Sequence, residues 1–417
     1  MDIVIAPSSL SGSVPAIPSK SAAHRLLICA ALADEPTALQ LSSSSDDIDA
    51  TIGCLTALGA EIKRTGDTIT VTPIGKAPSD PLLDCRESGS TLRFLLPVAA
   101  ALCEKARFTG GGRLPERPVV ELTDLMRRHG VSFSADCLPF ETAGRLTGGE
   151  FDISGSVSSQ YLTGLLLALP VLAQDAAVRL SSKLVSCGYV DMTLSALARF
   201  GVNIACAEGR YTVSGPKALC SPARISVDGD WSNAAFFLAA GAIGAPVTVT
   251  GLDPDSPQGD RAITMLLQRF GAGVAVGPAH VTVAPAELRG CEIDLAEVPD
   301  LLPVLAVVAA CAQGKTRFIG GERLRHKESD RLASTAAMIG SLGGKAEVFP
   351  DGLAVTGGKL TGGTVDSFHD HRIVMAAAVA GSICPRAVTI LGADAVNKSY
   401  PAFFSDYAKL GGKANVL

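Results

Sequence analysis

The sequence predicts an α/β protein of six β-α-β-α-β-β units, each about 70 residues long, arranged as two domains of three units. The first observation is a series of amphipathic helices that end at Gly59, Gly130, Gly201, Gly271, Gly343 and Gly411. The spacings between these glycines are 71, 71, 70, 72 and 68 residues. Each glycine suits the left-handed position after a helix, and a short strand signal follows it.

The second observation is a series of helices that are apolar on nearly every face. These helices begin just after Lys20, Ser90, Gln160, Asp230, Asp300 and Asp370, again about 70 residues apart. Bodies such as AAHRLLICAALA and LLPVLAVVAACA have no polar stripe, so these helices are expected inside and the glycine-ended helices outside them. Strand signals such as TITVTPI, FDISGSV and VTVTGL lie between the helices.

The six units account for the whole chain, and two domains of three units match ordinary domain size better than a solenoid does. We place the crossings near residues 15 and 228, so residues 15–228 form the N-terminal domain. The C-terminal domain is then discontinuous and consists of residues 1–14 and 229–417. The first ten residues, MDIVIAPSSL, have no basic n-region or long h-region and read as a strand of that domain.

Composition excludes several classes of partner. The chain has 417 residues, 47% apolar and 18% charged, with a net charge of −5, so no overall basic field favours nucleic acid or an anionic membrane. The long uncharged stretch at residues 234–252 is interrupted by glycine, proline and threonine, which argues against a membrane span. Eleven cysteines without a C-x-x-C pair favour buried free thiols in a reducing cytoplasm over disulfides or zinc.

Residues with chemical potential recur at the helix N-termini, where free backbone N–H groups and the helix dipole attract anions. The second helix of a unit starts 26 to 28 residues after the first. At the starts of both helix series, the basic side chains are Lys20, Arg117, Lys327, Arg331, Arg372 and Lys398. The serine donors at these starts are Ser158, Ser159 and Ser186. If the two domains face each other across a cleft walled by these helix ends, the cleft should bind a polyanion.

Plainer interpretations exist for each position taken alone. A serine or aspartate at a helix start is ordinarily a cap, and Asp230 fits that interpretation. Lys327 and Arg331 lie one turn apart and fit the basic face of a solvated helix. The recurrence of lysine and arginine at corresponding points of separate units favours an anion site, because capping does not explain basic residues.

Two carboxylates are candidates for acid and base chemistry. In the stretch RLRHKESDR, Glu328 lies beside Lys327 and one turn from Arg331, which favours its ionised form. Desolvation in a closed cleft opposes ionisation and would let Glu328 carry a proton. Asp300 heads a buried helix of the same unit and is the second candidate.

Nine motifs in order resemble the 5-enolpyruvylshikimate-3-phosphate synthase family, from residue 18 to about residue 404. They are PSKSAAHRLLICAALA, SGSTLR, LPERPV, GSVSSQYLTGLL, VDGDWSNAAFFLAA, VPDLLPVLAVVAA, RHKESDRL, DHRIVMA and NKSYPAFF. The resemblance implies two inside-out barrels of three units with buried parallel helices, and an active site in the cleft between the domains. It also implies transfer of the enolpyruvyl group of phosphoenolpyruvate to the 5-hydroxyl of shikimate 3-phosphate through a tetrahedral intermediate, on the pathway to chorismate and aromatic amino acids.

The resemblance further implies residue roles. Contacts to shikimate 3-phosphate would come from Lys20, Ser21, Arg25, Ser158, Ser159, Gln160, Ser186, Asp300, Lys327 and Arg323 or a neighbouring residue. Contacts to phosphoenolpyruvate would come from Lys20, Gly89, Arg117, Gln160, Arg331, Arg372 and Lys398. Asp300 would accept the hydroxyl proton, and Glu328 would give a proton to the methylene carbon and take one back. Lys20 and Lys327 would stabilise the developing charge, and no metal, organic cofactor or second subunit is expected.

Two departures from the family pattern and two alternatives remain. The glycine loop reads Glu87-Ser88-Gly89-Ser90 where the family often has Asn-x-Gly-Thr, and residues 369–372 read His-Asp-His-Arg where it often has Asn-Asp-His-Arg. One alternative is UDP-N-acetylglucosamine enolpyruvyl transferase, which usually carries a cysteine in the loop that here reads GGGRLPERPV. The other is an inactive homologue that binds shikimate 3-phosphate, against which the retained Lys20, Asp300, Lys327 and Glu328 argue.

Overall fold

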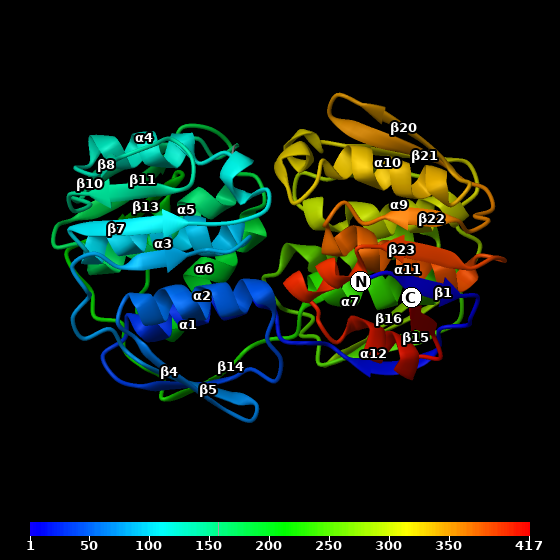
Figure 1. The fold of residues 1–417 in the computed structure, drawn as a ribbon, viewed down its shortest axis with the longest axis horizontal. Helices are drawn as coiled ribbons and strands as arrows, with labels where there is room; N and C mark the ends of the chain where they lie inside the picture. Colours follow the sequence, from blue (N-terminus) through cyan, green and yellow to red (C-terminus); the bar gives the residue numbers. More distant parts are fainter. Residues whose placement is uncertain (157) are drawn as a thin grey trace. The chain divides into compact units, whose positions relative to one another are not determined.

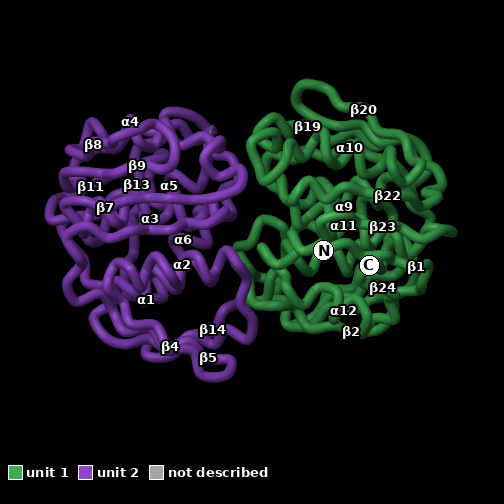
Figure 2. Tube along the Cα trace, in the orientation of Figure 1, with its two compact units in different colours: residues 1–19, 228–417 green, residues 20–227 purple. Residues whose placement is uncertain are grey.

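The computed structural model describes residues 1–156 and 158–417, and Val157, which ends the FDISGSV run, lies outside the described residues. The chain forms two compact units (Figure 2). Unit 1 contains residues 1–19 and 228–417, and unit 2 contains residues 20–227, whereas the sequence analysis placed the crossings near residues 15 and 228. Within unit 1 the two linker segments are hydrogen-bonded, since the Ser19 N–H donates to the Asp228 carbonyl at 2.7 Å.

The helices form the two series that the sequence predicts (Figure 1). The inner helices, buried over most of their length, are α1 (Lys20–Ala31), α3 (Gly89–Leu102), α5 (Ser159–Ala168), α7 (Trp231–Ile243), α9 (Leu302–Cys311) and α11 (His371–Ile383). The outer helices are α2 (Asp46–Ala57), α4 (Val120–Arg128), α6 (Cys187–Arg199), α8 (Ile263–Phe270), α10 (Arg331–Ser341) and α12 (Phe403–Lys409). The six glycines that end the outer helices all have left-handed backbone, with φ between +80° and +109°.

The described residues contain six four-stranded sheets of one topology, in which the first strand pairs parallel with the second and the remaining pairs are antiparallel. The sheets of unit 2 are β14 (Arg224–Ser226), β3 (Thr37–Gln40), β5 (Thr68–Thr72), β4 (Glu61–Thr65); β6 (Leu82–Asp84), β7 (Lys105–Thr109), β9 (Phe140–Ala143), β8 (Ser132–Phe133); and β10 (Gly149–Ile153), β11 (Ala176–Leu180), β13 (Arg210–Val213), β12 (Ala205–Ala207). Those of unit 1 are β2 (Gly12–Pro15), β15 (Val247–Thr250), β17 (His280–Ala284), β16 (Gly273–Val276); β18 (Glu292–Asp294), β19 (Lys315–Ile319), β21 (Gly352–Thr356), β20 (Lys345–Phe349); and β22 (Thr364–Asp366), β23 (Val388–Leu391), β1 (Ile3–Ala6), β24 (Lys413–Val416).

In the three repeats that begin at β6, β10 and β18, the chain runs from a first strand through an inner helix to a parallel second strand, and then through an outer helix to a hairpin. A parallel pair needs such a crossover, and α3 supplies it between β6 and β7. Segments distant in the chain complete the other three sheets. Strand β14, at the end of unit 2, pairs with β3 at its beginning. Strand β2 pairs with β15, and β1 pairs with β23 and β24 at the opposite end of the chain. The predicted β-α-β-α-β-β unit is therefore confirmed.

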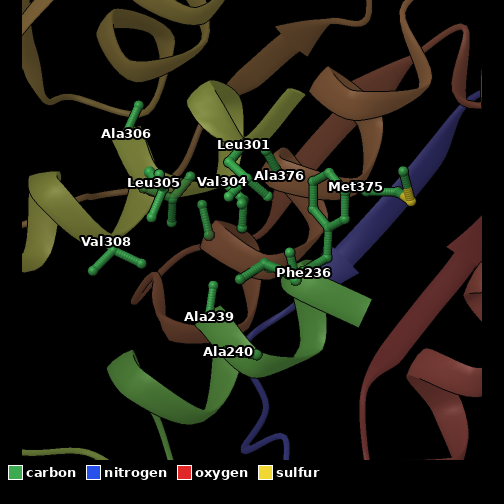
Figure 3. Close-up of a cluster of buried hydrophobic side chains, with 14 of the residues drawn as sticks. Phe236, Ala239, Ala240, Leu301, Val304, Leu305, Ala306, Val308, Met375 and Ala376 are labelled. Carbon is green, nitrogen blue, oxygen red and sulfur yellow. The ribbon is translucent and has the colours of Figure 1, made fainter. Parts of the chain in front are cut away.

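The core of unit 1 is formed where α7, α9 and α11 meet. Figure 3 shows Phe236 and Ala239 of α7 beside Val304 of α9 and Ala376 of α11. These side chains are fully buried, and small alanines beside bulkier residues let the three helices approach closely. The apolar composition of the inner helices thus follows from burial on all sides.

The cysteines only partly follow the prediction of buried thiols. All eleven are free, and five of them, including Cys29 and Cys384, are buried. Cys137, Cys187, Cys206 and Cys220 are exposed, because they lie in loops, at a helix start or on an edge strand rather than in the apolar helix bodies.

Among the described residues, no helix has the length and apolar character needed to cross a membrane.

The packing of α5 against α3 depends on Gly164. A Cβ atom at this position would lie 2.1 Å from the Arg93 carbonyl oxygen. Gly164→Ala should therefore force the helices apart and lower the free energy of unfolding by about 2–3 kcal/mol. Urea unfolding measures this change. Gly53→Ala in α2 is the control, because a Cβ there meets no atom within 4 Å, and it should raise stability by about 0.5–1 kcal/mol. Equal effects of the two variants would contradict the packing argument.

Candidate functional site

Asp300 is the centre of the charged group in unit 1. It lies in the 3-10 turn η4 (Pro299–Leu301), which leads into α9. Its Oδ1 accepts hydrogen bonds from Arg331 Nη1 at 2.6 Å and Lys327 Nζ at 3.4 Å, and its Oδ2 accepts one from Arg372 Nη2 at 2.9 Å. Side chains that the sequence analysis took from separate helix starts therefore meet at one carboxylate.

Arg331 is the buried cation that joins this group. Its side chain is 1% exposed, and its guanidinium also donates from Nε to Asp370 Oδ2 at 2.8 Å and from Nη2 to Glu328 Oε2 at 2.6 Å. Three carboxylates thus surround one guanidinium, which is the pairing a buried arginine requires. The interpretation of Arg331 as part of the basic face of a solvated helix is therefore wrong. Lys327 lies in extended backbone before α10 rather than on the helix.

Burial and charge act in opposite directions on these ionisable groups. Burial disfavours ionised Asp300, but Arg372, Lys327 and Arg331 outweigh it and hold the pKa of the carboxyl well below its usual range. Burial likewise disfavours ionised Asp370, and Arg331 lowers its pKa nonetheless. The carboxylates in turn raise the pKa of Arg331 above its ordinary value against the effect of burial. Asp300, Asp370 and Arg331 are therefore all charged at neutral pH.

The helix starts of unit 1 differ in what their aspartates do. Asp230 is a cap, as one interpretation predicted, because its Oδ1 accepts the Asn233 N–H at 2.7 Å. Asp370 caps α11 through the Arg372 N–H at 3.0 Å and binds Arg331 as well. Asp300 caps neither η4 nor α9. Asp300 is the one of these three aspartates that accepts hydrogen bonds from three cationic side chains.

Two further predicted residues lie in unit 1. Arg323 belongs to η5 (Glu322–His326) and donates from Nη2 to the Ala296 carbonyl at 2.9 Å. Lys398 ends η6 (Ala393–Lys398) and is buried. Since η6 packs against α11, Lys398 belongs to the repeat that also supplies Arg372.

In unit 2, Lys20 starts α1 and its Nζ lies 2.6 Å from Asp47 Oδ2 on α2. Both side chains are largely buried. Lys20 was predicted from sequence as a site residue, whereas Asp47 was not. The signal was available, because Asp47 follows Lys20 by 27 residues, the interval that also separates Asp300 from Lys327.

Gly89, Arg117 and Gln160 are brought together at the start of α3. A Cβ at Gly89 would lie 2.8 Å from Arg117 Nη1 and 2.5 Å from Arg93 Nη1, so only glycine leaves room for both guanidinium groups. Arg93, which was not among the predicted contacts, donates to Gln160 Oε1 at 3.3 Å, and Gln160 Nε2 donates to Ser90 Oγ at 3.1 Å. The sequence contained a signal for Arg93, because an arginine is unusual within an apolar helix body such as TLRFLL.

The predicted serines lie at the starts of α5 and α6. Ser158 caps α5 by accepting the Gln160 N–H at 3.3 Å, and Ser159 is the first, buried residue of that helix. Ser186 precedes α6 and has φ 55° and ψ 48°, a left-handed conformation that is strained for serine. Strain of this kind points to a functional constraint at Ser186.

Arg25 has its guanidinium inside unit 2, 2% exposed. In the described chain its four hydrogen bonds go to neutral oxygens, on Ser21, Thr163, Tyr189 and Thr193. Burial lowers the pKa of Arg25 to about 10. The residue thus places a positive charge without an acidic hydrogen-bond partner beneath the starts of α1, α5 and α6.

The predicted residues consequently form two sets with different chemistry. Unit 1 combines two carboxylates with basic side chains, namely Asp300, Glu328, Arg323, Lys327, Arg331, Arg372 and Lys398. Unit 2 combines basic side chains with neutral donors, namely Lys20, Ser21, Arg25, Gly89, Arg117, Ser158, Ser159, Gln160 and Ser186. Within the described chain, no three His, Cys, Asp or Glu side chains are grouped to hold a metal ion. The first set suits proton transfer and the second suits anion binding.

Comparison with known proteins gives consistent matches over the whole chain. The family model described as EPSP synthase (3-phosphoshikimate 1-carboxyvinyltransferase) matches residues 4–407. The 3-phosphoshikimate 1-carboxyvinyltransferase of Clostridium novyi is 39% identical over 424 residues, covering 99% of this chain and 98% of the relative. That of Methanocorpusculum labreanum is 39% identical over 420 residues, covering 99% of both.

Solved structures share the fold. An EPSP synthase from Acinetobacter baumannii aligns with a TM-score of 0.82 at 24% identity and covers 100% of both chains. The enolpyruvyl transferase NikO from Streptomyces tendae aligns with a TM-score of 0.78 at 21% identity, covering 99% of this chain and 98% of its own. The predicted α/β fold class is therefore confirmed.

Asp260, which sequence analysis missed, gives unit 1 a pH-dependent stability. It lies in η3 (Gly259–Ala262), is 2% exposed and accepts a hydrogen bond from the Ser232 hydroxyl. Burial and then the negative charge of Asp300 raise the pKa of Asp260 to about 6. Between its unfolded and folded pKa values the folded protein holds a proton that the unfolded chain releases, so the free energy of unfolding falls as pH rises.

Asp260→Asn should remove this pH dependence. Relative to the parent protein, the variant should gain up to about 3 kcal/mol of stability as pH rises from about 4.5 to about 7.5. Urea unfolding at both pH values measures the difference. Asp255→Asn is the control, since Asp255 is exposed in the same segment. A stability difference between Asp260→Asn and the parent that is the same at both pH values would contradict the raised pKa.

Proposed function

Because the chain belongs to the EPSP synthase (3-phosphoshikimate 1-carboxyvinyltransferase) family, we propose that it transfers the enolpyruvyl group of phosphoenolpyruvate to the 5-hydroxyl of shikimate 3-phosphate. The products are 5-enolpyruvylshikimate 3-phosphate and phosphate, on the shikimate pathway toward chorismate and aromatic amino acids. The observation that carries the proposal is the meeting of Asp300 with Lys327, Arg331 and Arg372. Joining two anions through a hydroxyl nucleophile requires both a base and concentrated positive charge.

Phosphoenolpyruvate has a carboxylate and a phosphate, and we assign basic side chains of both units to it. Arg331, Arg372 and Lys398 are the contributors from unit 1. Lys20, Gly89, Arg117 and Gln160 are those from unit 2. Arginine suits this task because its planar guanidinium binds a carboxylate or phosphate through two parallel hydrogen bonds. The open space at Gly89, which accommodates the Arg117 guanidinium, supports the unit 2 assignment.

Shikimate 3-phosphate is assigned mainly to the hydroxyl-rich helix starts of unit 2. Its contacts are Lys20, Ser21, Ser158, Ser159, Gln160, Ser186 and Arg25, with Asp300, Lys327 and Arg323 from unit 1. Backbone N–H groups at the starts of α5 and α6 add donors for a phosphate. Arg25 contributes here through its charge, because its hydrogen bonds already go to groups of unit 2.

The chemistry proceeds by addition and elimination. Asp300 takes the proton of the 5-hydroxyl as that oxygen bonds to C2 of phosphoenolpyruvate, while Glu328 gives a proton to the methylene carbon. The resulting tetrahedral intermediate has a methyl group, and Lys20 and Lys327 stabilise its charge. Glu328 then takes a proton from the methyl group as the C2–O bond to phosphate breaks. The departing phosphate takes up one proton, which the proton given up by Asp300 balances, so the enzyme returns to its starting state.

Substrate binding itself activates Asp300. Three cations hold its pKa well below the usual range, which makes it a weak base before substrate binds. The carboxylate and phosphate of phosphoenolpyruvate compete with Asp300 for Arg331 and Arg372. As those cations turn toward substrate, the proton affinity of Asp300 rises. The hydroxyl is therefore deprotonated only when both substrates are bound.

We further propose that the protein acts as a cytoplasmic monomer without metal or organic cofactor. The eleven free cysteines support a reducing compartment, because secreted proteins usually oxidise such thiols to disulfides. Both sets of assigned residues belong to a single chain, so the proposed chemistry does not call for a partner subunit.

The proposed function is tested by measuring phosphate release with phosphoenolpyruvate and shikimate 3-phosphate together. Controls lack one substrate or replace shikimate 3-phosphate with UDP-N-acetylglucosamine. We expect release only with shikimate 3-phosphate. Release only with UDP-N-acetylglucosamine would replace the proposed acceptor, and binding of shikimate 3-phosphate without any phosphate release would identify an inactive homologue.

Gly89→Ala should weaken the binding of phosphoenolpyruvate more than that of shikimate 3-phosphate. The added Cβ would lie 2.8 Å from Arg117 Nη1 and displace that guanidinium. We expect KM for phosphoenolpyruvate to rise at least about tenfold, because about one charge-assisted hydrogen bond is lost. KM for shikimate 3-phosphate should change less than about threefold. Gly111→Ala is the control, because a Cβ there meets no atom within 4 Å. Equal increases in both KM values would reject the assignment of Gly89 and Arg117.

A further inference from the structure

A line of four buried polar side chains joins α1, α2 and α3 inside unit 2. His24 Nδ1 lies 2.7 Å from Thr51 Oγ1, and Thr51 Oγ1 lies 2.7 Å from Thr91 Oγ1. Thr91 Oγ1 then donates to Ser88 Oγ at 2.8 Å. All four side chains are fully buried. Buried polar groups of this kind are costly unless each is satisfied, so the line constrains the three helices that supply it.

The single proton of each hydroxyl fixes the direction of this line. Thr91 gives its proton to Ser88, so Thr51 must be the donor between Thr51 and Thr91. The Thr51 proton is then used, and the proton between His24 and Thr51 must come from Nδ1 of the imidazole. The alternative acceptor for Thr91, the Asp47 carbonyl at 3.4 Å, leads to the same assignment.

His24 is therefore a neutral imidazole with its proton on Nδ1. Its Nε2 is buried and has no hydrogen-bond partner in the described chain. Burial lowers the pKa of His24 to about 3, with Lys20 and Arg25 acting in the same direction and Asp47 opposing them. The ring consequently stays neutral over the working pH range, and the direction of the line does not change with pH.

The Thr91 and Ser88 end of the line adjoins two residues assigned to phosphoenolpyruvate, Gly89 and Lys20. Ser88 Oγ caps α3 by accepting the Thr91 N–H at 3.2 Å, and the next residue is Gly89, against which the Arg117 guanidinium lies. Thr91 also contacts the backbone of Asp47, whose carboxylate binds Lys20 at 2.6 Å. Thr91 is thus within hydrogen-bonding reach of the segments that place both Lys20 and Gly89.

We propose that His24, Thr51 and Thr91 are positioning residues that hold the start of α3 and the Lys20 to Asp47 ion pair in the arrangement that binds phosphoenolpyruvate. The proposal rests on the proposed function, since that function assigns Lys20, Gly89 and Arg117 to this substrate. The three residues act through their neighbours and do not touch the reacting atoms.

Thr51→Val tests the positioning role, because valine keeps the shape of threonine and removes the hydroxyl at the middle of the line. We expect KM for phosphoenolpyruvate to rise about tenfold, with kcat and KM for shikimate 3-phosphate changed less than about threefold. Thr51→Ser restores the hydroxyl and should return KM to within about twofold of the parent value. Thr56→Val, an exposed threonine on the same helix, is the control and should leave all constants unchanged.

A merely structural role would give a different result. Loss of folded protein lowers the apparent kcat and leaves KM unchanged, because the remaining folded molecules are normal. An unchanged KM for phosphoenolpyruvate in Thr51→Val, with the parent active, overturns the positioning role alone. A parent protein that releases no phosphate overturns the proposed function and the positioning role together, so the two failures are distinguishable.

Nitrogen-15 NMR of the histidine side chains tests the assigned tautomer without any assay of activity. His24→Asn identifies the His24 signals among those of the six histidines. We expect a protonated Nδ1 and an unprotonated Nε2 whose shifts are constant from about pH 5.5 to about pH 8. A proton on Nε2, or titration near the ordinary histidine pKa of about 6.5, would overturn the assigned direction of the line.

Discussion

The buried guanidinium of Arg331 is the constraint on which the arrangement of unit 1 depends. Removing an arginine from water costs several kcal/mol unless carboxylates at good geometry offset that cost. Here Asp300, Glu328 and Asp370 do so, and they come from three different segments. Because each carboxylate must reach the same guanidinium, the starts of α9, α10 and α11 are held in register. The reactive groups are thereby placed by the same ion pairs that offset the burial of charge.

This arrangement also separates the two carboxylates assigned to proton transfer. Asp300 binds Lys327 and Arg372 in addition to Arg331, which favours its charged form. Glu328 accepts from the Nη2 atom of Arg331 and keeps 13% of its side chain exposed to solvent. One arginine therefore positions the proposed base and the proposed proton-exchanging group on different nitrogens. Unit 2 carries a set of cations and hydroxyls on its own helix starts.

The repeat architecture could be predicted from sequence because its signals are local. A glycine in left-handed backbone, an apolar helix body and a polar helix start each depend on a few neighbouring residues, and their period reveals the six units. Lys20 and Asp300 could be singled out for the same reason. Partners across space could not, since Asp47, Asp260 and the line from His24 to Ser88 join different helices. The exposed cysteines and the extended backbone at Lys327 also depend on tertiary surroundings.

The most direct test of the Arg331 cluster as the centre of proton transfer follows deuterium from solvent into the product. With the reaction run in heavy water, a transient methyl group at the former methylene carbon should leave deuterium in the vinyl group of 5-enolpyruvylshikimate 3-phosphate, as mass spectrometry would show. If Glu328 moves these protons, Glu328→Gln should slow the incorporation by about 100-fold or more while shikimate 3-phosphate still binds. Incorporation at the parent rate in Glu328→Gln would contradict the assignment and place proton transfer on another group.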